Sequence, residues 1–134
     1  MQAVLVDTNV ILDIVTRDPA WWRWSLQQLE RLSLQYRLWI NVVVYSELAI
    51  AYDRIEKLDA MLEDAQFELR EIPREAGFLA GRVFLSYRRR TGAKTGVLPD
   101  FYIGAHAAVM NLPLLTRDSA RYRTYFPRLT LIAP

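Results

Sequence analysis

The sequence predicts an α/β fold: a three-layer sandwich with a mainly parallel central sheet. Two observations lead to this fold class. Short apolar runs alternate with longer segments whose apolar residues recur every three or four positions, the pattern of helices packed around a parallel sheet. The 134 residues are 52% hydrophobic and show no repeat or linker, so they suit one domain with a buried core. We therefore expect a single domain over residues 1–134.

The first half of the chain alternates strand-like and helix-like segments. AVLV and LWIN are apolar runs of strand length. The segment from Val42 has a β-branched start, but it continues through Ser46, Glu47 and alanines, which are poor strand residues. In chain order we expect a strand at 3–6, helices at 9–15 and 20–36, a strand at 38–41, and helices at 42–52 and 54–65.

Prolines and turn residues divide the second half. FELREI alternates in polarity, as an edge strand does, and Pro73 then opens a helix that has one apolar face. A second proline, Pro99, stands where another helix begins, and Asp118 is expected to cap a short one. In chain order we expect a strand at 67–72, helices at 73–87 and 99–110, a strand at 112–116, a short helix after 118, and a strand at 129–133.

Composition limits the kinds of site and compartment. The chain has no cysteine, which excludes disulfides and thiolate metal sites and fits a cytoplasmic protein. No apolar run reaches the roughly 18 residues that a membrane-spanning helix needs, and no signal peptide is visible. The net charge is only +2, so composition by itself is weak support for a polyanionic partner.

Basic residues nevertheless cluster in two places. One cluster comprises Arg88, Arg89, Arg90 and Lys94, and Arg117 begins a second near the C-terminus. Arginine makes bidentate contacts with phosphate, so these five residues are candidates for binding a nucleic-acid backbone. The alternative for either cluster is a solvated surface.

Four acids stand where the predicted fold brings them together. Asp7 and Asp118 follow apolar strands, and in a parallel sheet the carboxyl ends of the strands form the ligand-binding edge. Glu47 lies beside the apolar stripe of its helix, and Asp100 opens a helix whose inward face includes Ile103. Carboxylates near a core are costly unless something compensates for their charge. We therefore expect these four acids to converge at one edge of the sheet.

Converging carboxylates without cysteine or clustered histidine indicate a hard cation, Mg²⁺ or Mn²⁺. Such an ion activates water and stabilises charge on a phosphoryl group. Each acid also has a local alternative. Asp7, Asp100 and Asp118 are suitable helix caps, and Glu47 could reach solvent at the edge of its stripe.

Other conspicuous residues are interpreted as structural. Asp13 is expected on the outer face of the first helix. His106, the only histidine, is expected to be a packed or surface side chain and not a catalytic one. The tryptophans could stack on bases, but aromatic residues at helical spacing favour a core or a dimer face. The tryptophans are Trp21, Trp22, Trp24 and Trp39.

Four motifs, in order and over the whole chain, resemble the PIN-domain ribonucleases, and among these the VapC toxins. They are LVDTNVILD, SEL, PDFYIGAHA and LLTRD. The resemblance implies a PIN-like fold in which Asp7, Glu47, Asp100 and Asp118 surround one or two Mg²⁺ or Mn²⁺ ions. It places Asn9 and Thr116 where they orient carboxylates or bound water.

The resemblance also implies an activity and partners. The implied reaction is hydrolysis of an RNA phosphodiester bond by a metal-activated water. The implied partners are an RNA substrate, which the two basic clusters would guide, and a VapB-type antitoxin; such toxins commonly form homodimers. One departure from the family is Gly104, where alanine is commoner, and we expect it to loosen that helix slightly.

Two other functions remain open. A receiver-type signalling domain is also α/β with an acidic Mg²⁺ pocket, but it requires an acidic pair at the first strand, where only Asp7 is present. A non-catalytic PIN-like binding module would need no complete set of acids. Metal binding separates the binding module from the nuclease and the receiver domain. Phosphorylation would then identify the receiver domain, and RNA cleavage the nuclease.

Overall fold

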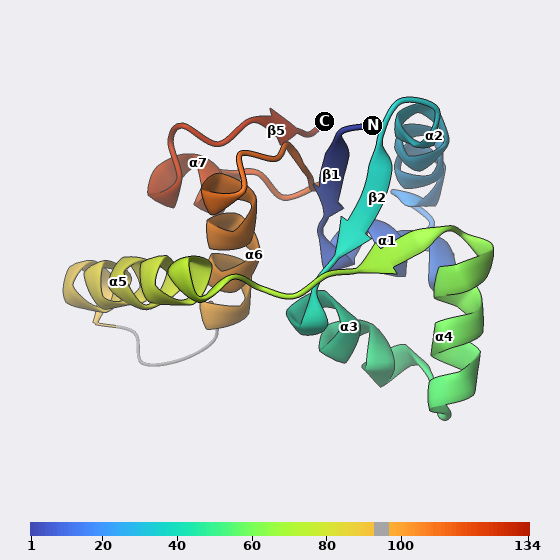
Figure 1. Cartoon of the computed structure of the whole chain (residues 1–134), viewed down its shortest axis with the longest axis horizontal. Coiled ribbons are helices and arrows are strands. Elements are labelled where there is room, and N and C mark those ends of the chain that lie inside the picture. The colour runs from blue at the N-terminus through green and yellow to red at the C-terminus, as the bar shows by residue number, and fades with distance from the viewer. Residues whose placement is uncertain (93–96) are drawn as a thin grey trace.

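The computed structural model describes residues 1–92 and 97–134 and has a five-stranded sheet at its centre (Figure 1). The strands are β1 (Ala3–Val6), β2 (Arg37–Ile40), β3 (Phe67–Leu69), β4 (Leu114–Leu115) and β5 (Leu131–Ile132). The helices are α1 (Thr8–Val15), α2 (Trp22–Ser33), α3 (Val42–Leu48), the 3₁₀ turn η1 (Ala49–Ala51), α4 (Ile55–Asp64), α5 (Arg74–Thr91), α6 (Leu98–Val109) and α7 (Ala120–Tyr125).

The sheet has the order β3-β2-β1-β4-β5, and every pairing is parallel. Helices flank it, with α2 to one side of β1 and β2 and α6 to the other in Figure 1. The predicted three-layer α/β fold is therefore confirmed. Because β1 is central, with Leu5 opposite Leu114 and Trp39 on its two neighbours, the residue that follows β1 lies at the middle of the carboxyl edge.

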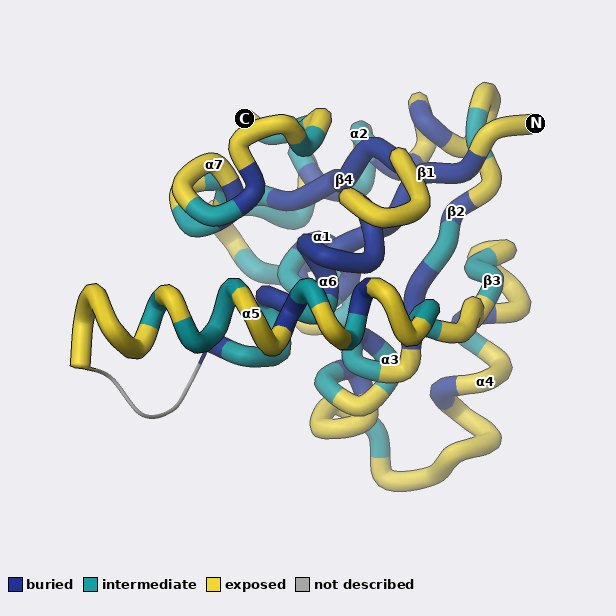
Figure 2. The backbone as a smooth tube through the Cα atoms, turned by 60° about the vertical axis from the view of Figure 1, so that its left-hand side comes forward, coloured by how far each residue is buried: buried dark blue, intermediate teal, exposed yellow. Residues whose placement is uncertain are grey.

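Burial is greatest where the sheet meets the helices packed on it. All four residues of β1 are buried, and Figure 2 shows the buried trace running through β1, β4 and α1. Helix α6 is buried from Phe101 to Ala107 except at Tyr102. A Cβ added to Gly104 would lie 2.5 Å from the ring of Phe126, so the glycine there admits an aromatic side chain and is explained by packing.

Helix α5 packs against α6 and then extends past the body of the domain (Figures 1 and 2). Its last turns carry Tyr87, which makes an edge-to-face contact with Tyr125 of α7 at 5.7 Å between ring centroids. Arg88, Arg89 and Arg90 follow on these turns and are exposed. None of the helices in residues 1–92 and 97–134 is long and apolar enough to cross a membrane.

Several element boundaries differ from the prediction. Strands β3, β4 and β5 are shorter than the ranges 67–72, 112–116 and 129–133, and the segment 42–52 divides into α3 and the turn η1. The expectation that Asp118 caps a helix is wrong. Helix α7 begins at Ala120 after Ser119, and no side chain caps it. Asp118 is instead two residues upstream, where its backbone belongs to the site described below.

Candidate active site

Asp7 is the centre of the site because β1 ends directly before it and α1 begins directly after it. Its side chain is 5% exposed. Oδ1 accepts a hydrogen bond from the backbone N–H of Thr8 at 2.7 Å, which makes Asp7 the N-cap of α1. Oδ2 accepts from the hydroxyl groups of Thr116 at 2.8 Å and Tyr122 at 2.9 Å. Asp7 is therefore both a helix cap and the most buried acid of the four.

Thr116 connects Asp7 to Asp118. The backbone N–H of Asp7 donates to Leu115 at 2.9 Å, so the ends of β1 and β4 lie side by side. Beyond them, the Thr116 hydroxyl accepts from the backbone N–H of Asp118 at 3.1 Å while it donates to Asp7. The amide of Asn9 donates to Asp7 at 3.4 Å and to Thr116 at 3.3 Å. Both residues therefore lie where they orient the Asp7 carboxylate.

Glu47 approaches from α3, on the side of the site away from β4. Its Oε1 accepts a hydrogen bond from the Thr8 hydroxyl at 2.6 Å, and the residue is half-buried. Helix α3 is aligned by Asn41, whose Oδ1 accepts from the backbone N–H groups of Val43 at 3.0 Å and Val44 at 3.1 Å. Thr8 thus binds Asp7 through its backbone and Glu47 through its side chain.

Asp100 lies in the first turn of α6 and is half-buried. The guanidinium of Arg121, from α7, forms an ion pair with its Oδ2. Both of these side chains remain about a third exposed, at 37% for Arg121 and 32% for Asp100. Helix α7 therefore contributes one donor to Asp100, through Arg121, and one to Asp7, through Tyr122.

The pKa shifts show that the acids form one electrostatic cluster. The pKa of Asp7 is raised from 3.8 to about 6, mainly by burial and in smaller part by the charge of Asp100, against the hydrogen bonds from Thr116, Tyr122 and Thr8. Burial, and then Asp100, also raise the pKa of Glu47. Burial raises the pKa of Asp100 itself, Arg121 lowers it, and Asp118 raises it. Asp100 is thus the acid with which the other three interact.

Tyr122 is a neutral donor in this cluster. Burial and the nearby negative charges of Asp7, Asp100 and Glu47 raise its pKa well above the ordinary value of 10.0. Its phenol therefore stays protonated at neutral pH and donates a hydrogen bond to Asp7. Only 2% of the residue is exposed.

The donor set suits a hard cation in its chemistry, because all four acids offer oxygen. Within the described residues, however, no three acidic or histidine side chains are already grouped closely enough to hold a metal ion. The hydrogen bonds explain this, since Glu47 is held by Thr8 and Asp100 by Arg121. To be bound by these carboxylates, a cation would have to replace Thr8 as the partner of Glu47 and Arg121 as the partner of Asp100.

Asp13 is not on an outer face of α1, and that prediction is wrong. Its side chain is 2% exposed. Its Oδ2 accepts hydrogen bonds from Nε of Arg117 at 2.8 Å and from the Ser25 hydroxyl at 2.8 Å, and its Oδ1 accepts from the same Nε at 3.1 Å. The helix places it toward α2, and a buried carboxylate there is tolerated because both oxygens have donors.

Arg117 is consequently engaged in the interior as well as at the site. Besides Asp13, its guanidinium lies 5.7 Å from the ring of Trp21, and its backbone N–H donates to Asn9 at 3.3 Å. The three arginines of the other basic cluster end α5, and Arg90 lies over the ring of Tyr125 at 5.5 Å. Lys94 lies outside the residues that the structure describes.

His106 is a packed histidine, as predicted. It is 1% exposed, and its Nδ1 lies 3.1 Å from the amide nitrogen of Asn41. Burial lowers its pKa, so the ring is neutral and Nδ1 accepts the hydrogen bond. Through Asn41 this histidine supports the start of α3, and within residues 1–92 and 97–134 it has no hydrogen bond to the acids.

Three residues that bind the acids were not predicted from the sequence: Thr8, Arg121 and Tyr122. Arg121 and Tyr122 lie in the short helix α7, which follows Asp118 in the sequence. No local pattern marked them as part of the site, because their partners, Asp100 and Asp7, are distant in sequence.

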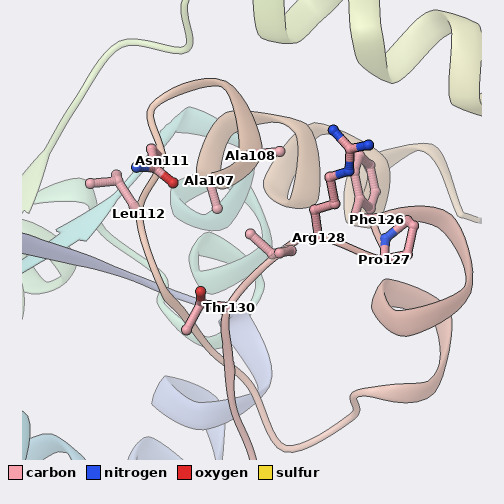
Figure 3. Close-up of a pocket in the computed structure, with 9 residues that line it drawn as sticks. Ala107, Ala108, Asn111, Leu112, Phe126, Pro127, Arg128 and Thr130 are labelled. Atoms are coloured by element: carbon pink, nitrogen blue, oxygen red, sulfur yellow. The ribbon is translucent and has the colours of Figure 1, made fainter.

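A separate pocket lies at the other end of α6 (Figure 3). Its volume is about 370 Å³, and its lining includes Asn111, which follows α6, and Arg128, which precedes β5, but none of the four acids. It is therefore distinct from the acid cluster at the carboxyl edge.

A family model described as the PIN domain matches residues 4–127. No curated protein sequence matches the chain. Solved structures match along almost the whole length. VapBC2 from Rickettsia felis, bound to a DNA fragment from its promoter, has a TM-score of 0.74 at 20% identity and covers 99% of each chain. VapBC-1 from nontypeable Haemophilus influenzae has a TM-score of 0.69 at 19% identity and covers 98% of each chain.

DNA-bound VapBC from Salmonella typhimurium is a third similar structure. Its TM-score is 0.68 at 22% identity, and the match covers 99% of this chain and 98% of that one. At such identities these likenesses concern the fold, and they extend over the elements that carry all four acids.

Proposed function

Because the chain belongs to the PIN-domain family, we propose that it is a metal-dependent endoribonuclease, the toxin of a VapBC-type toxin–antitoxin pair. The observation that carries the proposal is the electrostatic cluster. Asp100 interacts with Asp7, Glu47 and Asp118, which come from separate elements of the fold. Such a convergence of acids is costly unless a positive ligand compensates for it.

The ligand that we propose is Mg²⁺ or Mn²⁺, held by the carboxylates of Asp7, Glu47, Asp100 and Asp118. When bound, the cation would supply an acidified water and stabilise charge on a phosphoryl group. Thr116 and Asn9 would hold the Asp7 carboxylate toward it, since both donate to the same oxygen, Oδ2. Tyr122 donates to that oxygen as well and would keep its proton throughout.

RNA would reach the acids over basic surfaces. Arg88, Arg89 and Arg90 are exposed on the last turns of α5, and α5 contacts α7 through Tyr87 and Tyr125. Phosphate contacts of this kind supply affinity without sequence information. We propose the same role for Lys94, and for Arg117 a positioning role through Asn9 and Asp13.

The proposed partners follow from the relatives. The similar solved structures are VapBC complexes, so we propose a VapB-type antitoxin as partner and a cytoplasmic site of action. Exposed apolar residues such as Ile50 and Phe78, at 89% and 74% exposure, are available for an interface. A homodimer is proposed on the same ground.

The test is cleavage of a mixed pool of structured RNAs by the purified protein with Mg²⁺, with Mn²⁺ and with EDTA. We expect cleavage that requires metal and that is lost in Asp7→Asn and Asp100→Asn. The matched control is Asp64→Asn, the same change at an exposed acid, which should cleave normally. Metal-independent cleavage, or cleavage that persists in both site variants, would refute the assignment, and a protein that neither binds metal nor cleaves RNA would favour the non-catalytic binding module.

A further inference from the structure

Arg121 stands out because it neutralises the acid on which the cluster centres. Asp100 interacts with the other three carboxylates, yet its own Oδ2 is held by the Arg121 guanidinium. This is the one ion pair between an arginine and any of the four acids among the described residues. Arg121 thus occupies the position that a cation would need.

The arginine and a divalent cation compete for this carboxylate. A cation bound to Asp100 brings two further positive charges next to the guanidinium, and like charges at such separations repel strongly. The Arg121 side chain is 37% exposed, so it can move into solvent without breaking the core. Its ion pair with Asp100 is therefore releasable.

Tyr122 limits how far the released arginine can go. It is the next residue of α7, it is 2% exposed, and its hydroxyl donates to Asp7. Phe126 closes the same segment and is 6% exposed. These buried contacts hold the α7 backbone at the site. After the ion pair with Asp100 breaks, the Arg121 side chain therefore remains close to Asp100.

We propose that Arg121 is an exchangeable phosphate-binding residue: it pairs with Asp100 when no cation is bound, and it transfers to the RNA phosphate when the cation takes Asp100. This inference rests on the proposed nuclease function. A guanidinium binds phosphate through two parallel N–H donors, and donors of this kind stabilise the negative charge that develops on a phosphoryl group. In the metal-free protein the same residue keeps Asp100 paired.

The experiment compares Arg121→Gln with Arg123→Gln, an identical change of charge on the exposed side of the same helix. Mn²⁺ affinity is measured by calorimetry without RNA, and cleavage of the structured-RNA pool is then measured at saturating Mn²⁺. We expect Arg121→Gln to bind Mn²⁺ roughly 5-fold tighter, because a half-exposed ion pair no longer competes. We expect its cleavage rate to fall about 100-fold, because a phosphate donor is lost.

Arg121→Lys distinguishes the role of the charge from that of the planar donor. It should bind Mn²⁺ as the wild type does and cleave at an intermediate rate, and both variants should unfold cooperatively, as the wild type does. If Arg121→Gln binds Mn²⁺ no more tightly than Arg123→Gln, the competition is refuted. If it binds more tightly but cleaves at the wild-type rate, the transfer to phosphate is refuted. If the wild type itself binds no Mn²⁺, the proposed function fails and this inference fails with it.

Discussion

Replacing Asp7 by asparagine should change the stability of the metal-free protein in a way that depends on pH. Burial raises the pKa of Asp7 from 3.8 to about 6. Because the folded state holds this proton more tightly than the unfolded chain does, the stabilisation is complete below about pH 4 and is lost as the pH rises through about 6. One pKa unit corresponds to about 1.4 kcal/mol, so the loss is about 3 kcal/mol.

Asp7→Asn removes this loss but introduces a fixed cost. The amide nitrogen must face either the Thr8 N–H or the hydroxyl groups of Thr116 and Tyr122, all of which now donate to Asp7. One unmatched donor costs about 1–2 kcal/mol. We therefore expect the variant to be less stable than wild type near pH 4 and more stable by about 1–2 kcal/mol near pH 8.

The assay is urea unfolding in EDTA between pH 4 and 8, with Asp64→Asn as the exposed control. Glu47 and Asp100 also have raised pKa values, but they titrate in both proteins, so the difference in unfolding free energy reports Asp7 together with its coupling to Asp100. A difference between variant and wild type that stays constant with pH would refute the assignment of Asp7 as a buried, desolvated acid.

Three further predictions concern the metal, the core and the buried ion pair. Mn²⁺ at 100 times its dissociation constant should raise the unfolding free energy by about 2.7 kcal/mol in wild type but not in Asp100→Asn, and an equal shift in both, measured by thermal unfolding, would exclude these carboxylates as ligands. Gly104→Ala should lower the unfolding free energy by about 1–3 kcal/mol, because the added Cβ would lie 2.5 Å from the ring of Phe126. Gly81→Ala, with open space around the added Cβ, should raise the unfolding free energy by about 0.5–1 kcal/mol. Similar melting temperatures for the two variants would contradict this packing. Arg117→Gln should cost about 2–3 kcal/mol in urea unfolding, because it leaves a carboxylate that is 2% exposed without its charged partner, and a neutral result would mean that this carboxylate is solvated.

Much of the fold was predictable because local patterns carry it. The apolar run of β1 and the amphipathic periods of α4 and α5 show, from residues close together in the sequence, which side chains are buried. Strand ends were less predictable, because β3 and β4 stop where their partners stop and not where their apolar pattern does. Strand length therefore depended on pairing with segments that are distant in sequence.

The acids of the candidate site divide in the same manner. Asp7 was recognisable because a carboxylate directly after a buried strand conflicts with its surroundings. Asp13 was misassigned because its burial depends on Arg117, 104 residues away, and on Ser25 of another helix. The periodicity of a helix shows which of its faces is apolar. It does not show whether a charged side chain on another face pairs with a buried residue of a different element.

The sequence by itself determined the alternation of strands and helices and the acids that follow two of the strands, because the side-chain period within each element is a local property and parallel strands bring their carboxyl ends to one edge of the sheet. Only the tertiary structure decided what those acids contact. Arg121 reaches Asp100 across 21 residues, and Tyr122 reaches Asp7 across 115. These pairs exist because α6, α7 and β1 pack together, and no pattern within any one of these elements contains that contact.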